Sequence, residues 1–343
     1  MKTKFVILIG LFLVLQPLAV FAYPGESIVL DTNGDYTITY WNGVRILQVK
    51  HVPATKIEPT LSSSFNLGGA WLNTYSYSLA NGQNAKQPIR SIYVRGMTSI
   101  FSQQPMTEIS SGMSIAASLA AMQSLSAPIV TPARWESLAG NEPDSAAKQI
   151  MWSFYTASHP NDPLIGVMPN TTQSGFGFAS LDLPGVVAVQ LEGYTPIQQG
   201  YEDEGPIPDS AIYAQLDQLE KNDFLLRNAA APMIAIPTPY DAAVTLENIQ
   251  THAHTWITKQ LLNATFSTQL DTSFQAAIAA YRANQPQTAI IQLQTMRTLI
   301  KQQQPDADKN DVTPTVNLPA PPATIDLLAA RILYFDLGYV ISR

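Results

Sequence analysis

Four oxygen-bearing residues, Asp306, Asp308, Asn310 and Asp311, have the spacing of a calcium-binding loop. Ca²⁺ takes carboxylate and amide oxygens from such loops, and one bound cation would offset the repulsion among the acids. No glutamate follows at the position that completes an EF-hand loop. The sequence therefore makes these residues a candidate for a weak calcium site, with a solvated loop as the alternative. Calcium is the one cofactor that the sequence suggests.

A similar spacing earlier in the chain has a competing explanation. Asp31, Asn33 and Asp35 also place oxygens at alternate positions, but Asn33 is followed by Gly34. Asn-Gly is the strongest sequence signal for a two-residue hairpin turn. We therefore expect a turn between two strands here, rather than a metal site.

Two other groups of polar residues could take part in chemistry. His252 and His254 stand two positions apart in a stretch with helical periodicity. Residues two apart on a helix do not face each other, so we expect a packed or surface pair rather than two metal ligands. The acidic run at 202–204 lies on a hinge rich in Gly and Pro. It indicates a solvated linker rather than a catalytic pair, whose carboxylates must face each other across a cleft.

Motifs of catalytic sites are missing from the sequence, which has no HExxH, GxSxG, P-loop or GxGxxG. We therefore predict no catalytic or cofactor-binding residue and a protein that is not an enzyme. A sugar-stacking face could form from the aromatic residues Tyr36, Tyr40, Trp41, Trp71, Tyr75 and Tyr77. Their alternation with small residues indicates instead that most belong to the core or to cross-strand pairs.

The first 22 residues have the pattern of a secretory signal peptide. Lys2 and Lys4 form a basic start, an apolar run follows, and Val20 and Ala22 are the small residues before a cleavage site. The apolar run is shorter than the roughly 20 residues that a membrane-spanning helix needs. We therefore expect a secreted or periplasmic protein whose mature chain has no transmembrane segment.

The composition excludes several classes of partner and site. The net charge is −7, and loss of residues 1–22 would remove two lysines and no acid. An acidic chain is a poor match for nucleic acid or for anionic membrane surfaces. The absence of cysteine excludes disulfides, thiol nucleophiles and thiolate metal sites. A protein or glycan partner outside the cell remains open, and the oligomeric state is not predicted.

Residues 23–200 have the pattern of an Ig-like β-sandwich. Short runs rich in Val, Ile, Thr and Tyr are separated by Gly, Pro and Asn. The expected strands are 27–30, 35–41, 44–50, 71–79, 89–94, 150–155, 175–180 and 186–191. Residues 106–126 interrupt this pattern with Ala, Ser and Met, and we expect a short helix or a long loop there.

The rest of the chain is expected to be helical. Residues 201–240 form an acidic linker, a helix capped by Ser210 and an extended connector at 231–239. Residues 241–343 should form an antiparallel helical bundle, in which helices begin at Asp241, Asp271 and Pro286 and a last helix covers 323–340. Asn284 and Gln285 supply the turn before Pro286.

Two segments carry a family resemblance. Ser273–Ile300 together with Leu327-Leu328-Ala329-Ala330 resembles the FIMAH type of C-terminal helical domain, found on bacterial surface and secreted proteins. The β region, with Trp135, Gly175-Phe-Gly-Phe-Ala-Ser180 and Leu183-Pro-Gly185, resembles uncharacterised secreted bacterial β-sandwich proteins. The resemblance implies a binding or architectural role outside the cytoplasm, and it carries over no catalytic residue.

The expected function is a non-catalytic binding or architectural protein with an unidentified ligand. One alternative is a carbohydrate- or calcium-binding module on the sandwich face, which an exposed aromatic row would support. A second alternative is a hydrolase of unrecognised type. That alternative requires a pocket with a carboxyl group or a histidine of shifted pKa.

Overall fold

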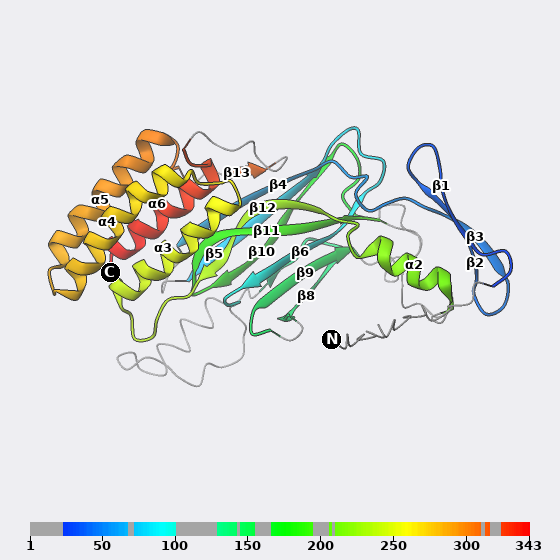
Figure 1. Cartoon of the computed structure of the whole chain (residues 1–343), viewed down its shortest axis with the longest axis horizontal. Helices are drawn as coiled ribbons and strands as arrows, with labels where there is room; N and C mark the ends of the chain where they lie inside the picture. The colour runs from blue at the N-terminus through cyan, green and yellow to red at the C-terminus, as the bar shows by residue number, and fades with distance from the viewer. Residues whose placement is uncertain are drawn as a thin grey trace, which may run out of the picture. The chain divides into compact units, whose positions relative to one another are not determined.

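The computed structural model describes residues 23–67, 72–100, 129–142, 145–154, 166–194, 206–207, 210–309, 313–315 and 324–343. Three antiparallel sheets form in the N-terminal and middle parts of this described chain, and helices follow at its C-terminal end (Figure 1). Contacts divide the chain into two compact units, residues 1–53 with 195–222 and residues 54–194 with 223–343. This division groups the C-terminal helices with the middle β region, whereas the predicted boundaries lay at residues 200 and 240.

The described residues of the smaller unit form a three-stranded meander and one helix. Its elements are β1 (Ser27–Leu30), β2 (Tyr36–Trp41), β3 (Ile46–His51) and α2 (Ala211–Glu220). Gly34 turns the chain between β1 and β2 with a φ of 78°, which confirms the turn expected at Asn33-Gly34. Gly43, in the Asn-Gly pair between β2 and β3, has a φ of 95°. The side chain of Ser210 accepts a hydrogen bond from the Tyr213 amide, as the predicted cap requires.

The larger unit contains two five-stranded sheets, each antiparallel. The first has the order β13 (Thr313–Thr315), β4 (Pro59–Leu67), β5 (Asn73–Asn81), β10 (Thr171–Ser180) and β7 (Ile129–Val130). The second has the order β12 (Leu225–Ile234), β11 (Leu183–Gly193), β6 (Ile89–Met97), β9 (Lys148–Phe154) and β8 (Trp135–Asn141).

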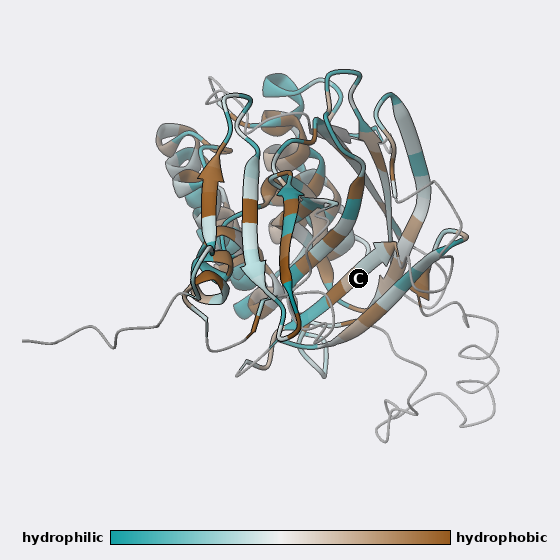
Figure 2. Ribbon diagram, turned by 90° about the vertical axis from the view of Figure 1, so that its right-hand side faces the viewer, coloured by the Kyte–Doolittle hydropathy of each residue, from teal (hydrophilic) through white to brown (hydrophobic). Residues whose placement is uncertain are grey.

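Aromatic side chains join the two five-stranded sheets. Trp135 of β8 meets Phe176 of β10 edge to face with ring centroids 4.9 Å apart. The hydroxyl of Tyr77 on β5 donates to the carbonyl of Ala230 on β12 at 2.7 Å. Figure 2 shows hydrophobic and hydrophilic residues alternating along the strands, as expected when one face of a sheet is buried.

Strand β12 replaces the extended connector predicted at 231–239. It begins at Leu225, pairs with β11 along its length, and buries Ala229, Ala230 and Ala231. Alanine has a low strand propensity, so the sequence gives little sign of a strand here. Pro232 is compatible with the sheet because β12 is an edge strand, where a missing amide donor breaks no ladder.

Four helices lie side by side in the C-terminal part (Figure 1). They are α3 (Ala242–Thr258), α4 (Ala264–Arg282), α5 (Pro286–Gln303) and α6 (Leu327–Ile341). Helix α4 contacts α3 and α5, and α6 contacts α3, α5 and strands β11 and β12. The helices therefore share a continuous core with the second sheet.

Local signals predicted some helix ends correctly and others wrongly. Asp241 caps α3, and Pro286 is in the first turn of α5, as expected. The prediction that a helix begins at Asp271 is wrong, because Asn263 caps α4 and Asp271 lies in its interior. The last helix begins at Leu327 after the cap Asp326, four residues later than predicted.

Some predicted features lie outside the described residues, namely the segment 106–126, the acidic run 202–204 and Trp71. Among the described helices, none combines the length and the apolar character that crossing a membrane would require.

Candidate functional site

A pocket of about 300 Å³ opens between α5, α6 and the turn that follows α5. We call it the arginine pocket, because Arg297 and Arg331 line it together with Lys309, Tyr334 and Phe335. Cationic and aromatic side chains therefore share one small cavity. All of its lining residues belong to the larger of the two units.

Arg297 of α5 is held flat against α6. Its guanidinium carbon lies 3.9 Å from the centroid of the Tyr334 ring, a cation–π contact. Gly338 lies beside the same guanidinium, where a Cβ would be 3.5 Å from its carbon, an ordinary van der Waals contact. The Nε of Arg297 is buried and has no hydrogen-bond partner. This positively charged group thus retains an unused donor. A buried donor without a partner typically lowers the free energy of unfolding by about 1–3 kcal/mol.

Arg331 of α6 ties the pocket to the turn after α5. Only 7% of this residue is exposed, and its Nε donates to the backbone carbonyl of Asp306 at 3.2 Å. A buried guanidinium needs such oxygen partners, since charge that leaves water without them is strongly disfavoured. Arg331 therefore helps to fix the turn that forms one wall of the pocket.

Two lysines accompany the acids of this turn. The Nζ of Lys301 lies 2.5 Å from a carboxylate oxygen of Asp308, and the Nζ of Lys309 lies 2.8 Å from one of Asp306. The hydrogen bond from Lys301 lowers the pKa of Asp308 below its ordinary value. Both described acids of the predicted calcium loop thus have an ammonium partner at the pocket.

The calcium site stays a prediction. Asn310 and Asp311 lie outside the described residues. In the part of the chain that the structure describes, no three His, Asp or Glu side chains are grouped so as to hold a metal ion. Calorimetric titration with calcium chloride tests this site directly.

Aromatic groups form the apolar wall of the arginine pocket. Phe335 of α6 packs edge to face on Phe65 of β4, with ring centroids 5.1 Å apart. The Tyr339 hydroxyl accepts a hydrogen bond from Nη2 of Arg343 at 2.7 Å. The cavity therefore has a cationic part and an aromatic part, which suits a ligand with an anionic group on an apolar body.

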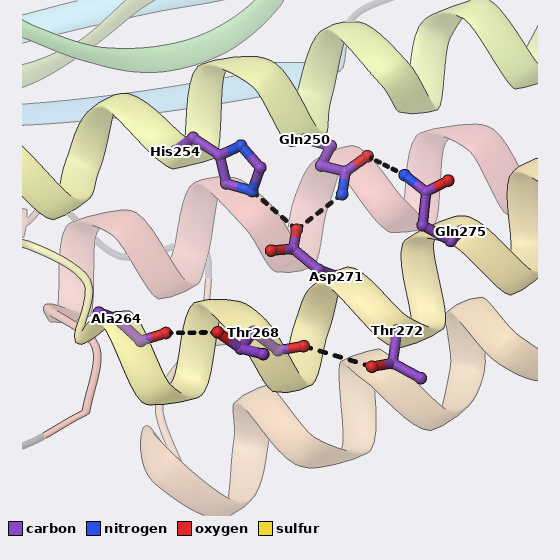
Figure 3. A network of polar contacts seen from close by, with 7 residues as sticks. All are labelled: Gln250, His254, Ala264, Thr268, Asp271, Thr272 and Gln275. Atoms are coloured by element: carbon purple, nitrogen blue, oxygen red, sulfur yellow. Dashed lines mark hydrogen bonds and ion pairs between the residues drawn. The ribbon is translucent and has the colours of Figure 1, made fainter.

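The two histidines do not converge. His252 packs on the backbone of β11 at Gly185, with its ring at 90° to that of Trp256, and burial lowers its pKa to about 4. His254 lies on the outer side of α3, where its Nε2 is 2.7 Å from Oδ1 of Asp271 (Figure 3). The same oxygen accepts from Gln250 at 2.6 Å, so Asp271 links α3 to α4.

The earlier acidic triplet forms a hairpin turn, as expected. The side chain of Asn33 donates to Asp35, and Asp35 pairs with Lys50 at 2.9 Å. Asp31 accepts a hydrogen bond from the Thr37 hydroxyl at 3.2 Å. The oxygens of this triplet are thus engaged within the β1–β2–β3 meander.

The predicted aromatic face is mostly core. Tyr40, Tyr75 and Tyr77 are at most 2% exposed, and Tyr36 and Trp41 are half-buried. A sugar cannot stack on rings that face the interior. The described members of this set therefore do not form the exposed row that the carbohydrate alternative called for.

Sequence reasoning missed the arginine pocket. Arg297 and Arg331 belong to different helices and share no short motif. One local signal was present, because Arg331, Tyr334 and Gly338 recur at helical spacing along one side of α6. Comparison of the chain with protein-family models, with curated proteins and with solved structures gives no match.

Proposed function

We propose that this chain is a non-catalytic binding protein that takes an anionic group of its ligand into the arginine pocket. The observation that carries the proposal is the buried, unpartnered Nε of Arg297 on a guanidinium that lies over the Tyr334 ring at the wall of the pocket. Guanidinium groups form strong, directional hydrogen bonds with carboxylates and phosphates. A bound anion would supply the acceptor that Arg297 lacks.

The sequence and the fold support the expected location and the expected architecture of this binding protein. The basic and apolar start of residues 1–22 supports export to the periplasm or the medium, where the ligand would be met. The two five-stranded sheets with a shared core support an Ig-like sandwich, and the side-by-side helices α3 to α6 support a FIMAH-like bundle. On this proposal, sheets and helices together form the scaffold of a binding site.

Replacement of Arg297 by methionine tests the proposal. Methionine retains much of the apolar stem that packs on Tyr334 but removes the charge and every donor. We expect at least one of acetate, benzoate and inorganic phosphate to raise the melting temperature of the purified chain at constant ionic strength. The same anion should leave the melting temperature of Arg297→Met unchanged.

A matched control is Arg282→Met. Arg282 lies at the end of α4, pairs with Glu247, and does not line the pocket. This variant should respond to anions as the unmodified chain does. The proposal fails if none of the three anions changes the melting temperature, or if Arg297→Met responds as strongly as Arg282→Met.

A further inference from the structure

Resting on the export that the proposed function includes, we infer that signal peptidase cuts this chain between Ala22 and Tyr23, and that Glu26 binds the new α-ammonium group of Tyr23. Two features lead to this assignment, namely the cleavage signal in the sequence and the contacts of Glu26 in the smaller unit. Neither depends on the arginine pocket.

The sequence places the bond to be cut directly before Tyr23. Val20 and Ala22 are the small residues before this bond, and they follow an apolar run with a basic start. Hydrolysis adds the hydroxyl of water to the carbonyl carbon of Ala22 and its proton to the nitrogen of Tyr23. At neutral pH the acidic proton of Ala22 moves to the amine, so a carboxylate and an ammonium group result.

Glu26 already accepts a hydrogen bond from the nitrogen that the cut would free. Its Oε2 lies 2.8 Å from the backbone nitrogen of Tyr23. Its Oε1 accepts from the amide of Trp41, the last residue of β2, at 3.0 Å. One carboxylate thus joins Tyr23 to the central strand of the meander.

A tight turn holds Tyr23 and Glu26 in this position. The amide of Glu26 donates to the carbonyl of Tyr23 at 3.1 Å, with Pro24 and Gly25 between them. Gly25 has a φ of 94°, and proline followed by glycine is a common centre of a type II turn. The ring of Tyr23 also lies 6.5 Å from that of Trp41, between centroids. The turn involves only residues 23–26, so removal of residues 1–22 leaves its hydrogen bond in place.

Cleavage turns the hydrogen bond between Tyr23 and Glu26 into an ion pair. A backbone amide offers one proton, whereas an ammonium group offers three protons and a full positive charge. Hydrogen bonds between charged partners are roughly twice as strong as neutral ones. Tyr23 is 44% exposed, so water and salt weaken the pair and its effect on stability is modest. A chain that begins at Tyr23 should still have a more stable smaller unit than one that continues before it.

The first experiment locates the cut. The full chain with a C-terminal tag is expressed in a bacterial host that has a signal peptidase, and the N-terminus of the exported protein is determined by intact mass and N-terminal sequencing. We expect Tyr23 to be the first residue, and Ala22→Phe to prevent cleavage at this bond. An exported chain that begins at another residue overturns the inference while export stands. A chain that keeps residues 1–22 overturns export as well, but it leaves the anion site, which Arg297→Met tests separately.

The second experiment tests the ion pair by scanning calorimetry, which records the transitions of both units. One chain begins at Tyr23, released from a removable N-terminal fusion. A second carries Ser-Gly-Ser-Gly before Tyr23, which places the ammonium group up to roughly 13 Å away, beyond the screening length of about 10 Å at 0.1 M salt. Glu26→Gln is made in both chains, because glutamine keeps an acceptor oxygen but lacks the charge.

In the chain that begins at Tyr23, Glu26→Gln should lower the melting temperature at pH 7 by about 1–4 °C. The difference should vanish at pH 9.5, because an α-ammonium group ordinarily loses its proton near pH 8. Arg45, in the turn after Trp41, keeps its charge at both pH values, and the other titrating groups are the same in the compared chains. An effect of Glu26→Gln that persists at pH 9.5, that is equal in the extended chain, or that is absent at pH 7 overturns the ion pair.

Discussion

Asp336 of α6 is a carboxyl group buried in the described core. It is 0% exposed, and neither of its carboxylate oxygens has a hydrogen-bond partner. Burial raises the pKa of Asp336 well above its ordinary value, because the charged form cannot be solvated there. The charge of Asp336 would in turn help to raise the pKa of Tyr75, so the two side chains are close. Burial therefore favours the protonated form of Asp336 in the folded protein.

The raised pKa of Asp336 predicts that Asp336→Asn is stabilising in a pH-dependent way. The unfolded chain releases the proton near pH 3.8, whereas the folded chain keeps it to a higher pH, so stability falls as pH rises from about 4 towards the raised pKa. Asparagine has the same shape but no proton to lose. The variant should gain in free energy of unfolding relative to the unmodified chain between pH 5 and pH 8. Urea unfolding at both pH values measures this gain.

The comparison between the two pH values is the decisive control. A substitution that merely improves packing would change stability equally at pH 5 and at pH 8. An equal difference at both values would therefore show that Asp336 is not held in its protonated form. Other titrating groups cancel, because they are the same in the two chains.

At the scale of elements, the contact between α3 and β11 depends on a neutral histidine. His252 lies over Gly185 of β11, and Lys259 of the same helical segment donates to the Val186 carbonyl at 3.0 Å. Burial first, and the charge of Lys259 second, lower the pKa of His252 to about 4. A protonated imidazole at this interface would have no acceptor for its Nε2 proton.

His252 should therefore make the protein less stable in acid. As pH falls from 6.5 towards 4, the unfolded chain takes up a proton on this residue while the folded chain does not, so stability is lost in that window. The loss is on the order of 3 kcal/mol. We expect His252→Gln to remove this part of the pH dependence in urea unfolding between pH 7 and pH 4.

His254→Gln provides the matched control for His252→Gln. His254 is exposed on the same helix and contacts Asp271 at the surface. The His254→Gln variant should therefore lose stability in acid as the unmodified chain does, because His252 at the α3–β11 contact is unchanged. If both variants show the same pH profile as the unmodified chain, protonation of His252 does not control this contact.

The elements also show which features a sequence can predict. Ser210, Asp241 and Asn284 mark helix ends through hydrogen bonds and backbone angles within a few residues, so local patterns were sufficient. Strand β4 was missed because its three serines, Ser62 to Ser64, lack the usual strand residues. Its place is set by pairing with β5.

Local sequence patterns could not predict the candidate site either, because it also depends on contacts between distant segments. Asp306 and Asp308 drew attention as oxygen donors, but the charge around them depends on Lys301 and on the two arginines of α5 and α6. Arg297 and Arg331 become neighbours only when α6 packs against α5. Helix packing between distant segments was not predictable from spacing, so the pocket emerged only from the fold.

At the scale of the whole molecule, the helices and the sheets of the larger unit belong to one core. Phe335 of α6 packs on Phe65 of β4, and α6 also contacts β11 and β12. Removal of the helices would expose the apolar surface that they cover on these strands. The sequence predicted a separate helical domain, and such a domain would unfold on its own.

The shared core predicts a single cooperative transition for the larger unit. In urea, circular dichroism at 222 nm reports mainly on α3 to α6, and tryptophan fluorescence reports on Trp135 and Trp152 between the sheets. Replacing Trp41, Trp71 and Trp256 by phenylalanine leaves only these two tryptophans, since Trp41 lies in the smaller unit and Trp256 in α3. In this variant the two probes should have the same midpoint, because loss of the helices exposes the sheet core at once. A helical transition that precedes the fluorescence change by more than the error of the midpoint would show that α3 to α6 fold independently, and that the arginine pocket does not depend on the sheets for its stability.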